Sequence, residues 1–527
     1  MPVSKPDIPT PPTTTDEQNA PKKPKNPAPT PPAPLTPKPV PLKPKAKTIT
    51  ENDTILPFYV SARDYLDARG KDGGETLILK YKVKTLSADK KTESSEREII
   101  LSLGEDFAAF KSGVSTRIYD FRMRRFLTVS PRVANQDDGL YFDNVSLYAK
   151  AYRNISTVNK ASNNGQRETV LLSAKSALDV FWIESAMGWA ARDIADKIEF
   201  EMKDDTLLAR YKTKPVAKII AAKTPFITQG QKDAFFAFAH FEVLLHPVVL
   251  RQMYAFDAPP KTLEFQVFNP KHPAGQTQVW TLVDQNKNAG NFPLPANAKS
   301  TPERQPVSPL VFVINEAVHG RALGGRPSKA VLSQAFDKAF LSNAYYDAWL
   351  LAEKYYALYG ACQMSTQAIC KGRQIIASLM QTGLGESERA SDQKLVAFLD
   401  ILEKIKTPST RVDGLKLFLP YTDDPNTPSF VLRQAAMARA KLKGPQISGL
   451  ESLSAQAMLK QALIKDPYDP NSYVGLAQVL AANGAFEQSW DIYDALRAGI
   501  PGAQRVARRI NRFEQKLQKI APAFFAP

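Results

Sequence analysis

The spacing of apolar residues changes once along this chain, near residue 327, and that change limits the folds it can adopt. Between about residue 55 and residue 315 apolar residues recur at every second position, which is the period of a β-strand. Beyond residue 327 they recur about every 3.6 residues, the period of an α-helix. The chain is therefore expected to be α+β, with a β-rich domain containing inserted helices at 55–315 and an all-α domain at 316–527.

Strands of the first domain are expected where the alternation is strict. The clearest is a strand with an apolar face of Leu77, Leu79, Tyr81 and Val83 and an opposite face of Ile78, Lys80, Lys82 and Lys84. Further strands are expected at 99–103, over Tyr119–Arg124 leading into 126–129, and in the pairs 198–202 with 207–211 and 262–268 with 279–283. Helices are expected at about 168–195 and 230–254, and a proline-containing loop at about 284–309.

Residues 1–54 are excluded from both domains by their composition. The first 50 residues hold 16 of the 41 prolines and eight lysines against three acids. Such a segment cannot bury a core, so we expect a mobile, polyproline-like leader. The favoured interpretation is a solvated spacer or tether, and the alternative is a ligand for a proline-recognising module.

The charge of the chain argues against a dense nucleic-acid footprint. The net charge is +16, and the leader supplies +5 of it, as eight lysines minus three acids. The remaining +11 is spread over 477 residues. Nucleic acid is therefore not the expected partner, because clustering of charge matters more than its sum.

The compartment depends on what precedes the given sequence. No run of about 18 apolar residues occurs, so no transmembrane helix is expected and any membrane contact is indirect. The chain does not open with a charged-then-apolar signal segment, which predicts a cytoplasmic protein. If a signal segment is missing, the leader is typical of spacers in bacterial envelope proteins, and the periplasm or cell envelope is expected instead.

The second domain is expected to be a stack of helical hairpins. Glycine and proline interrupt its 3.6-residue period at intervals, as they do between helices. Helices are expected at 328–341, 344–360, 366–381, 387–406, 428–443, 453–465, 470–483, 486–498 and 502–520.

Residues 470–503 carry the one specific motif of the chain. A first helix with packing positions Tyr473, Leu476, Ala477 and Leu480, a turn at Gly484, and a second helix with Phe486, Tyr493 and a terminating Pro501 follow one another at the spacing of a unit of about 34 residues. One unit earlier, Pro467, Ala455 and Leu459 occupy the positions of Pro501, Ser489 and Tyr493. This segment resembles a tetratricopeptide repeat (TPR), from which Ser489 and Leu496 depart where small residues are usual.

The TPR resemblance implies a protein-binding face on the first helix of the repeat. The matching positions are Asn471, Val474, Gln478, Ala481 and Ala482. They lack the lysine and paired asparagines with which some family members grip a terminal carboxylate. The resemblance therefore implies an apolar or mixed peptide as ligand.

The last helix is expected to be amphipathic. An apolar stripe is made by Val506, Ile510, Phe513, Leu517 and Ile520. The opposite face carries Arg505, Arg508, Arg509, Arg512, Lys516 and Lys519. A cap that ends the helical stack is the favoured interpretation, and a helix that binds nucleic acid or an anionic surface is the alternative.

Two cysteines, Cys362 and Cys370, lie close together in the sequence. On one continuous helix they would be about 12 Å apart, too far for a disulfide. The segment 360–366 allows a turn that would bring them together, and a bridge would indicate an oxidising compartment. Two unpaired buried thiols are the alternative, and no further cysteine or histidine nearby suggests a metal.

No catalytic signature is found. His240 and His246 are interpreted as core histidines, and Glu316 with His319 lacks a second ligand pair for a metal. The segment 320–328 is glycine-rich but is better explained by a helix start at Pro327 than by a phosphate site.

A basic and aromatic cluster in the first domain has two interpretations. It consists of Arg122, Arg124 and Arg125 with Tyr119 and Phe121. The favoured interpretation is the solvated face of a strand, and the alternative is a face that binds nucleic acid.

These observations favour a bacterial protein-interaction scaffold or assembly protein, tethered by its leader and binding a protein partner. It is expected to be neither an enzyme nor dependent on a cofactor or metal. One alternative is an enzyme whose site lies at 55–315, near Glu184, His240 or Glu316. Another is nucleic-acid or anionic-surface binding through the last helix.

Overall fold

A computed structural model describes most of the chain behind the leader. The described residues are 61–70, 74–87, 93–131, 139–150, 152, 197–211, 213–243, 245–269, 272–300, 309–360, 368–382, 393–442, 447–500 and 503–520. The expected leader at 1–54 and the expected helix at 168–195 lie outside them. The described residues all belong to one compact unit.

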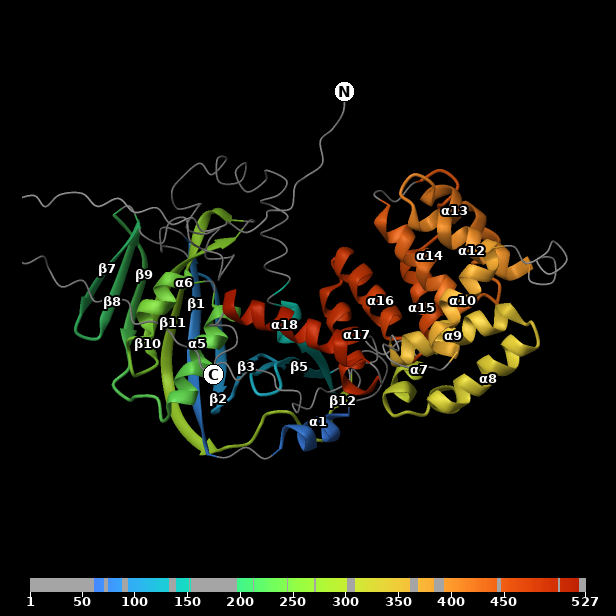
Figure 1. The fold of residues 1–527 in the computed structure, drawn as a ribbon. Coiled ribbons are helices and arrows are strands. Elements are labelled where there is room, and N and C mark those ends of the chain that lie inside the picture. The colour runs from blue at the N-terminus through green and yellow to red at the C-terminus, as the bar shows by residue number, and fades with distance from the viewer. Residues whose placement is uncertain are drawn as a thin grey trace, which may run out of the picture. The chain divides into compact units, whose positions relative to one another are not determined.

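The described residues confirm an α+β fold, with a 12-stranded sheet followed by helices (Figure 1). The strands are β1 Glu75–Ser87, β2 Glu93–Leu103, β3 Phe107–Ser112, β4 Ser115–Asp120, β5 Arg125–Pro131, β6 Leu140–Ser146, β7 Ile198–Lys203, β8 Thr206–Tyr211, β9 Lys214–Ala221, β10 Pro260–Asn269, β11 His272–Ala289 and β12 Lys299–Ser300. Their order is β12-β6-β5-β4-β3-β2-β1-β11-β10-β9-β8-β7. The pairings are antiparallel except that of β12 with β6.

Strand β1 has the expected two faces. Leu77, Leu79, Tyr81 and Val83 are buried in the core of the sheet. On the opposite face Lys82 and Lys84 form ion pairs with Glu96 of β2, and Lys80 pairs with Glu98. The two expected hairpins also form, as β7–β8 and β10–β11.

Two expectations for this half are wrong in their extent. The strand expected over Tyr119–Arg124 ends at Asp120, because the Asp120 carboxylate accepts a hydrogen bond from the backbone N–H of Met123 and closes a turn. The loop expected from residue 284 begins later, because β11 continues to Ala289 and pairs there with the start of β1. Pairing with β1 therefore extends β11, and the spacing of apolar residues within 284–289 does not reveal this pairing.

Two helices pack on the sheet where one helical stretch is expected at 230–254. They are α5 Gln229–Glu242 and α6 Pro247–Met253. His246 caps α6 with Nδ1 as acceptor of the Val248 N–H, and Pro247 begins the helix. Phe238 of α5 stacks on Phe110 of β3 with 5.6 Å between ring centroids, which places α5 across the core face of the sheet.

The helical half follows the expected hairpins closely. Its helices are α7 Pro309–Val318, α8 Lys329–Leu341, α9 Tyr345–Tyr359, α10 Ala368–Thr382, α12 Gln393–Lys406, α13 Arg411–Phe418, α14 Ser429–Lys441, α15 Ala455–Lys465, α16 Pro470–Ala482, α17 Phe486–Gly499 and α18 Gln504–Ile520. Short 3₁₀ turns lie at Ala322–Gly324 and Leu419–Tyr421, and helix α1 Ala62–Arg69 precedes the sheet. Helices α7 and α13 were not expected, and α7 spans the expected domain boundary at 315/316. No helix among the described residues is long and apolar enough to span a membrane.

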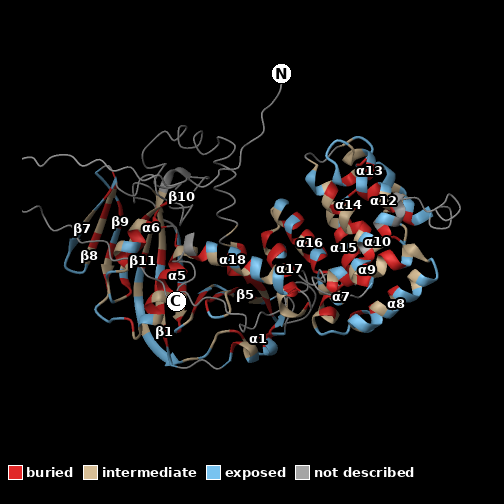
Figure 2. Ribbon diagram, viewed as in Figure 1, coloured by how far each residue is buried: buried red, intermediate tan, exposed pale blue. Residues whose placement is uncertain are grey.

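Helix α17 belongs to two cores at once. Its Phe486 and Trp490 are buried with the sheet, α5 and α6. Its Ile492, Ala495 and Leu496 are buried with the other helices. Buried residues accordingly occupy more than one side of α17 in Figure 2. This helix joins the packing of the two halves.

Gly499, the last residue of α17, provides a test of the packing against α7. A Cβ at this position would lie 2.4 Å from the backbone carbonyl oxygen of Val318. Because backbone cannot yield without shifting α7, Gly499→Ala is expected to lower the free energy of unfolding by about 2 kcal/mol in urea titrations. The exposed substitution Gln488→Ala on the same helix is the control, expected to change it by less than about 0.5 kcal/mol. A Gly499→Ala loss as small as that of the control would contradict the close approach.

Candidate functional site

The segment 470–503 forms a hairpin of α16 and α17. Asp469 caps α16 with its carboxylate as acceptor of the Asn471 N–H, and Gly484 takes the left-handed conformation at the turn with φ of 81°. The Ser489 hydroxyl donates a 2.7 Å hydrogen bond to the Ala477 carbonyl oxygen. The departure at Ser489 therefore replaces a small apolar contact by a satisfied polar one, and the two helices still approach closely.

The expected partner-binding residues form one stripe along α16, part of which is covered. Asn471, Gln478 and Ala482 are exposed. Val474 is half-buried against the helical core, and Ala481 is half-buried against the core of the sheet. The free part of the stripe therefore consists of two amide side chains and one methyl group.

Neighbouring helices further limit this face of the stack. Helix α9 packs against α12 and α16. Its Trp349 meets Phe430 of α14 edge-on, with 5.6 Å between ring centroids. Helix α9 therefore covers part of α14 and α16.

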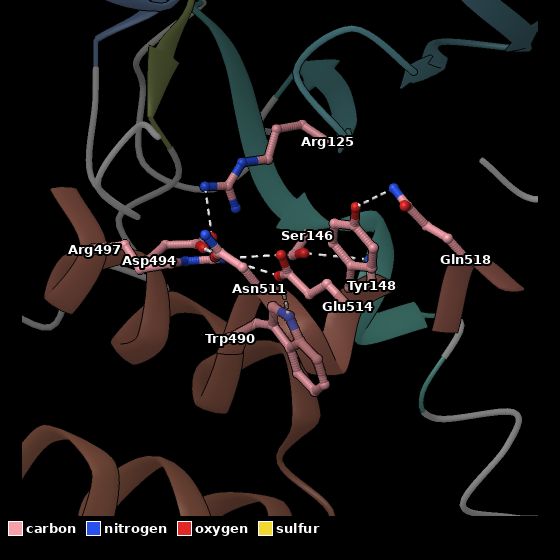
Figure 3. Close-up of polar contacts among 9 residues, drawn as sticks. All are labelled: Arg125, Ser146, Tyr148, Trp490, Asp494, Arg497, Asn511, Glu514 and Gln518. Atoms are coloured by element: carbon pink, nitrogen blue, oxygen red, sulfur yellow. Dashed lines mark hydrogen bonds and ion pairs between the residues drawn. The ribbon is translucent and has the colours of Figure 1, made fainter. Parts of the chain in front are cut away.

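Helix α17 is joined to the sheet by buried ion pairs (Figure 3). Arg125, the first residue of β5, lies 2.6 Å from the Asp494 carboxylate, and both side chains are 4% exposed. The same carboxylate pairs with Arg497, one turn further along α17. Asp494 is therefore shared between a cation of the sheet and a cation of its own helix.

The network continues into α18. Arg497 donates hydrogen bonds of 2.6 and 2.9 Å to the Glu514 carboxylate and of 3.0 Å to the Asn511 side-chain oxygen. The Trp490 indole N–H donates to Glu514 at 2.9 Å. Beside this group the Gln518 amide donates to the Tyr148 hydroxyl at 2.7 Å, linking residues 370 positions apart (Figure 3). We call Arg125, Asp494, Arg497 and Glu514 the seam network.

The seam network holds two arginines and two carboxylates, so its charges cancel. Burial alone lowers the pKa of Arg497, but the Glu514 and Asp494 carboxylates outweigh burial and raise it. Arg497 therefore stays charged, as the two carboxylates require. A buried network of this kind is stable only when every charge keeps its partner.

Helix α18 has the two faces expected of it. Ile510, Glu514 and Leu517 are buried, and Phe513 contacts the rings of Tyr152 and Trp490. The expected basic residues that the structure describes, Arg505, Arg508, Arg509, Arg512 and Lys516, are all exposed. The helix therefore packs through one face and leaves a cationic face uncovered by the described residues.

The nucleic-acid face considered for β4 does not form, and neither does the solvated strand face that was favoured. Arg122 lies in the turn after β4 and pairs with Asp106. Arg125 is buried in the seam network. Sequence reasoning missed this role, because nothing in the basic run at 122–125 marks one arginine as buried.

The histidine, metal and phosphate candidates form no common site among the described residues. Burial, with a smaller effect of Arg251, lowers the pKa of His240 to about 4, as for a neutral histidine within packed helices. Glu316 pairs with Arg321, and no group of three metal-binding side chains occurs among the described residues. Ser328 caps α8 after Pro327, which confirms the helix start expected there.

Of the two cysteines that are expected to pair, the structure describes only Cys370. Cys370, near the start of α10, is disulfide-bonded. Cys362 is the other cysteine of the chain and lies outside the described residues. Glu184 lies outside them as well.

The chain was compared with protein-family models and with curated proteins. No protein-family model matches the chain, and no curated protein matches it significantly.

The seam network predicts a large cost for an incomplete set of charges. Arg497→Leu leaves Asp494 and Glu514 with too few cations, and should lower the free energy of unfolding by about 3–5 kcal/mol in urea titrations. Arg508→Leu removes an exposed arginine of α18 and serves as the control, with an expected change below about 0.5 kcal/mol. Equal effects of the two substitutions would show that the buried charges do not hold α17 to the sheet.

Proposed function

We propose that this protein is an interaction scaffold that binds a segment of a protein partner along the exposed stripe of α16. The observation that carries the proposal is the stripe itself: Asn471, Gln478 and Ala482 stay exposed on a helix whose other sides are buried. The TPR-like pattern of the hairpin supports it, since such repeats bind proteins through the first helix.

The seam network supports a scaffold role by holding the stripe in place. Helix α17 packs against α16 on one side and is ion-paired to β5 on the other. A surface held in one conformation loses less conformational entropy on binding than a flexible one. We therefore infer that the stripe is pre-organised for its partner.

The chemistry of the stripe defines the kind of segment it would take. Its exposed side chains are uncharged, and the half-buried Ala481 and Val474 beside them are apolar. Amide groups can hydrogen-bond to a backbone, and small side chains allow it to approach closely. The proposed ligand is a peptide segment of mixed apolar and polar character, without an acidic end.

A photocrosslinking experiment tests this proposal. The crosslinking amino acid p-benzoylphenylalanine is placed at position 478, with the equally exposed position 488 of α17 as the matched control. In cells that express the full chain, position 478 is expected to yield one defined adduct that position 488 does not. Gln478→Glu with Ala482→Glu should then weaken binding of the purified partner at least about tenfold, because each introduced charge would be desolvated.

Two outcomes would contradict the proposal. One is equal crosslinking from positions 478 and 488. The other is unchanged affinity of the partner for Gln478→Glu/Ala482→Glu. Ala481 is left intact in this design because it packs against the core of the sheet, so that a substitution there would also affect folding.

The cationic face of α18 favours a second candidate function, the binding of an anionic surface. Arg505, Arg508, Arg509, Arg512 and Lys516 follow one another at helical spacing and are exposed. The one acidic residue of α18, Glu514, is buried in the seam network and does not offset them at the surface. A surface of phosphate headgroups is the ligand that this arrangement fits best.

Vesicle sedimentation tests the second candidate. Vesicles of phosphatidylglycerol should bind the protein, vesicles of phosphatidylcholine should not, and binding should weaken as salt rises from about 50 mM to about 200 mM. Arg508→Gln with Arg512→Gln should reduce binding about 30-fold at low salt. Lys338→Gln with Lys406→Gln, which removes exposed lysines of α8 and α12, is the matched control. Equal losses for the two pairs would reject a specific role for α18.

A further inference from the structure

Where helix α5 ends, the described residues leave a hollow on the core face of the sheet. A cleft of about 400 Å³ lies there, between the last turn of α5 and strands β2, β3, β4, β10 and β11. Its lining residues are Arg97, Phe110, Ser112, Ser115, Arg117, Glu242, Val267, Gln278 and Trp280. The strands extend beyond the helix that covers them, and the cleft is the result.

The register of the sheet explains why these residues share one face. Arg97 of β2 lies opposite Val83 of β1, and Val83 lies opposite Trp280 of β11. Residues directly opposite each other in a sheet project to the same side. With neighbouring strands about 4.8 Å apart, Arg97 and Trp280 start about 10 Å apart on the same face. That separation fits one aromatic ring with an attached charged group.

Arg97 supplies a cation that its sequence neighbours do not neutralise. Glu96 pairs with Lys82 and Lys84, and Glu98 with Lys80, all on the opposite face of the sheet. Side chains at adjacent strand positions project to opposite faces, so neither glutamate reaches the cleft. Arg97 itself is exposed and forms no ion pair with the described residues.

The second arginine of the cleft is already paired. Arg117 donates a 2.7 Å hydrogen bond to Glu242 at the end of α5, and the Tyr119 hydroxyl donates to the same carboxylate. Glu242 is therefore held against the wall of the cleft with its charge balanced by Arg117. Two arginines and one glutamate leave the lining with one net positive charge, which belongs to Arg97.

The rest of the lining combines an apolar floor with hydrogen-bond donors. Trp280 is 3% exposed and Phe110 is 5% exposed, so each ring lies in the core and only its edge reaches the cleft. The Trp280 indole N–H donates to the Gln278 side-chain oxygen at 3.2 Å, which leaves the Gln278 amide group as a donor. Ser112 and Ser115 add hydroxyl groups near the end of the β3–β4 hairpin.

We propose that this cleft binds an organic monoanion, a carboxylate carried on a compact aromatic body. The carboxylate pairs with Arg97 and accepts hydrogen bonds from Ser112 or Ser115. The aromatic body lies against Trp280, which shares a row of the sheet with Arg97. This inference stands apart from the partner-binding stripe on α16 and does not depend on it.

Calorimetric titration of the full chain with 3-phenylpropionate tests the site. Its neutral counterpart 3-phenylpropanamide has the same size and lacks the charge. The carboxylate should bind with a dissociation constant below about 10 mM, and the amide at least about tenfold more weakly. Arg97→Gln should weaken carboxylate binding about tenfold or more, because a charge-assisted hydrogen bond is lost.

Arg210→Gln removes a partly exposed arginine of β8 that does not line the cleft and is the control, with unchanged binding expected. Trp280→Leu should weaken binding of the carboxylate and the amide alike, and circular dichroism checks that each variant folds. The proposal is overturned by three results: no binding at about 10 mM, equal binding of carboxylate and amide, or equal affinity for Arg97→Gln and wild type.

Discussion

The carboxylate of Asp494 is shared between two arginines that come from different halves of the fold. Arg125 begins a strand of the sheet, and Arg497 lies one turn along the same helix as Asp494. Glu514 of the next helix completes a neutral set that is almost wholly buried. Removing any one member would leave a net charge away from water, which costs several kcal/mol. The position of the helical hairpins on the sheet is therefore tied to the presence of all four side chains.

The apolar contacts around this network explain why its charges can be buried. Trp490, Phe513 and Tyr152 pack their rings together beside it, with centroid separations of 5.2 to 5.9 Å. Trp490 is almost fully buried there, and the low dielectric of such a site strengthens each ion pair. Trp490 of α17 and Tyr152 belong to the core of the sheet, and Phe513 extends this contact to α18. Apolar packing supplies the main stabilisation, and the ion pairs define one orientation of α17 against the sheet.

Much of the fold, the stripe on α16 and the two faces of α18 could be predicted from local patterns, but the seam network and the cleft could not. Apart from α13, strict alternation in β1 and the helical periods from α8 onward were sufficient, because each of these elements buries one face and its sequence shows that face. The seam network could not be predicted from local patterns. Arg125 stands in a run of basic residues, and the acid that pairs with it lies on a helix near the other end of the chain. The cleft could not be predicted in this way either, because its lining comes from five strands and a helix.

A protein-interaction scaffold with a fixed binding stripe requires that the sheet and the terminal helices open together. Hydrogen exchange measured by mass spectrometry on the full chain tests this directly, by comparing peptides from β5 and β6 with peptides from α17 and α18. The account predicts that the slowest amides of both groups exchange with the same opening free energy and respond equally to urea. Protection of one group under conditions in which the other has fully exchanged would contradict it.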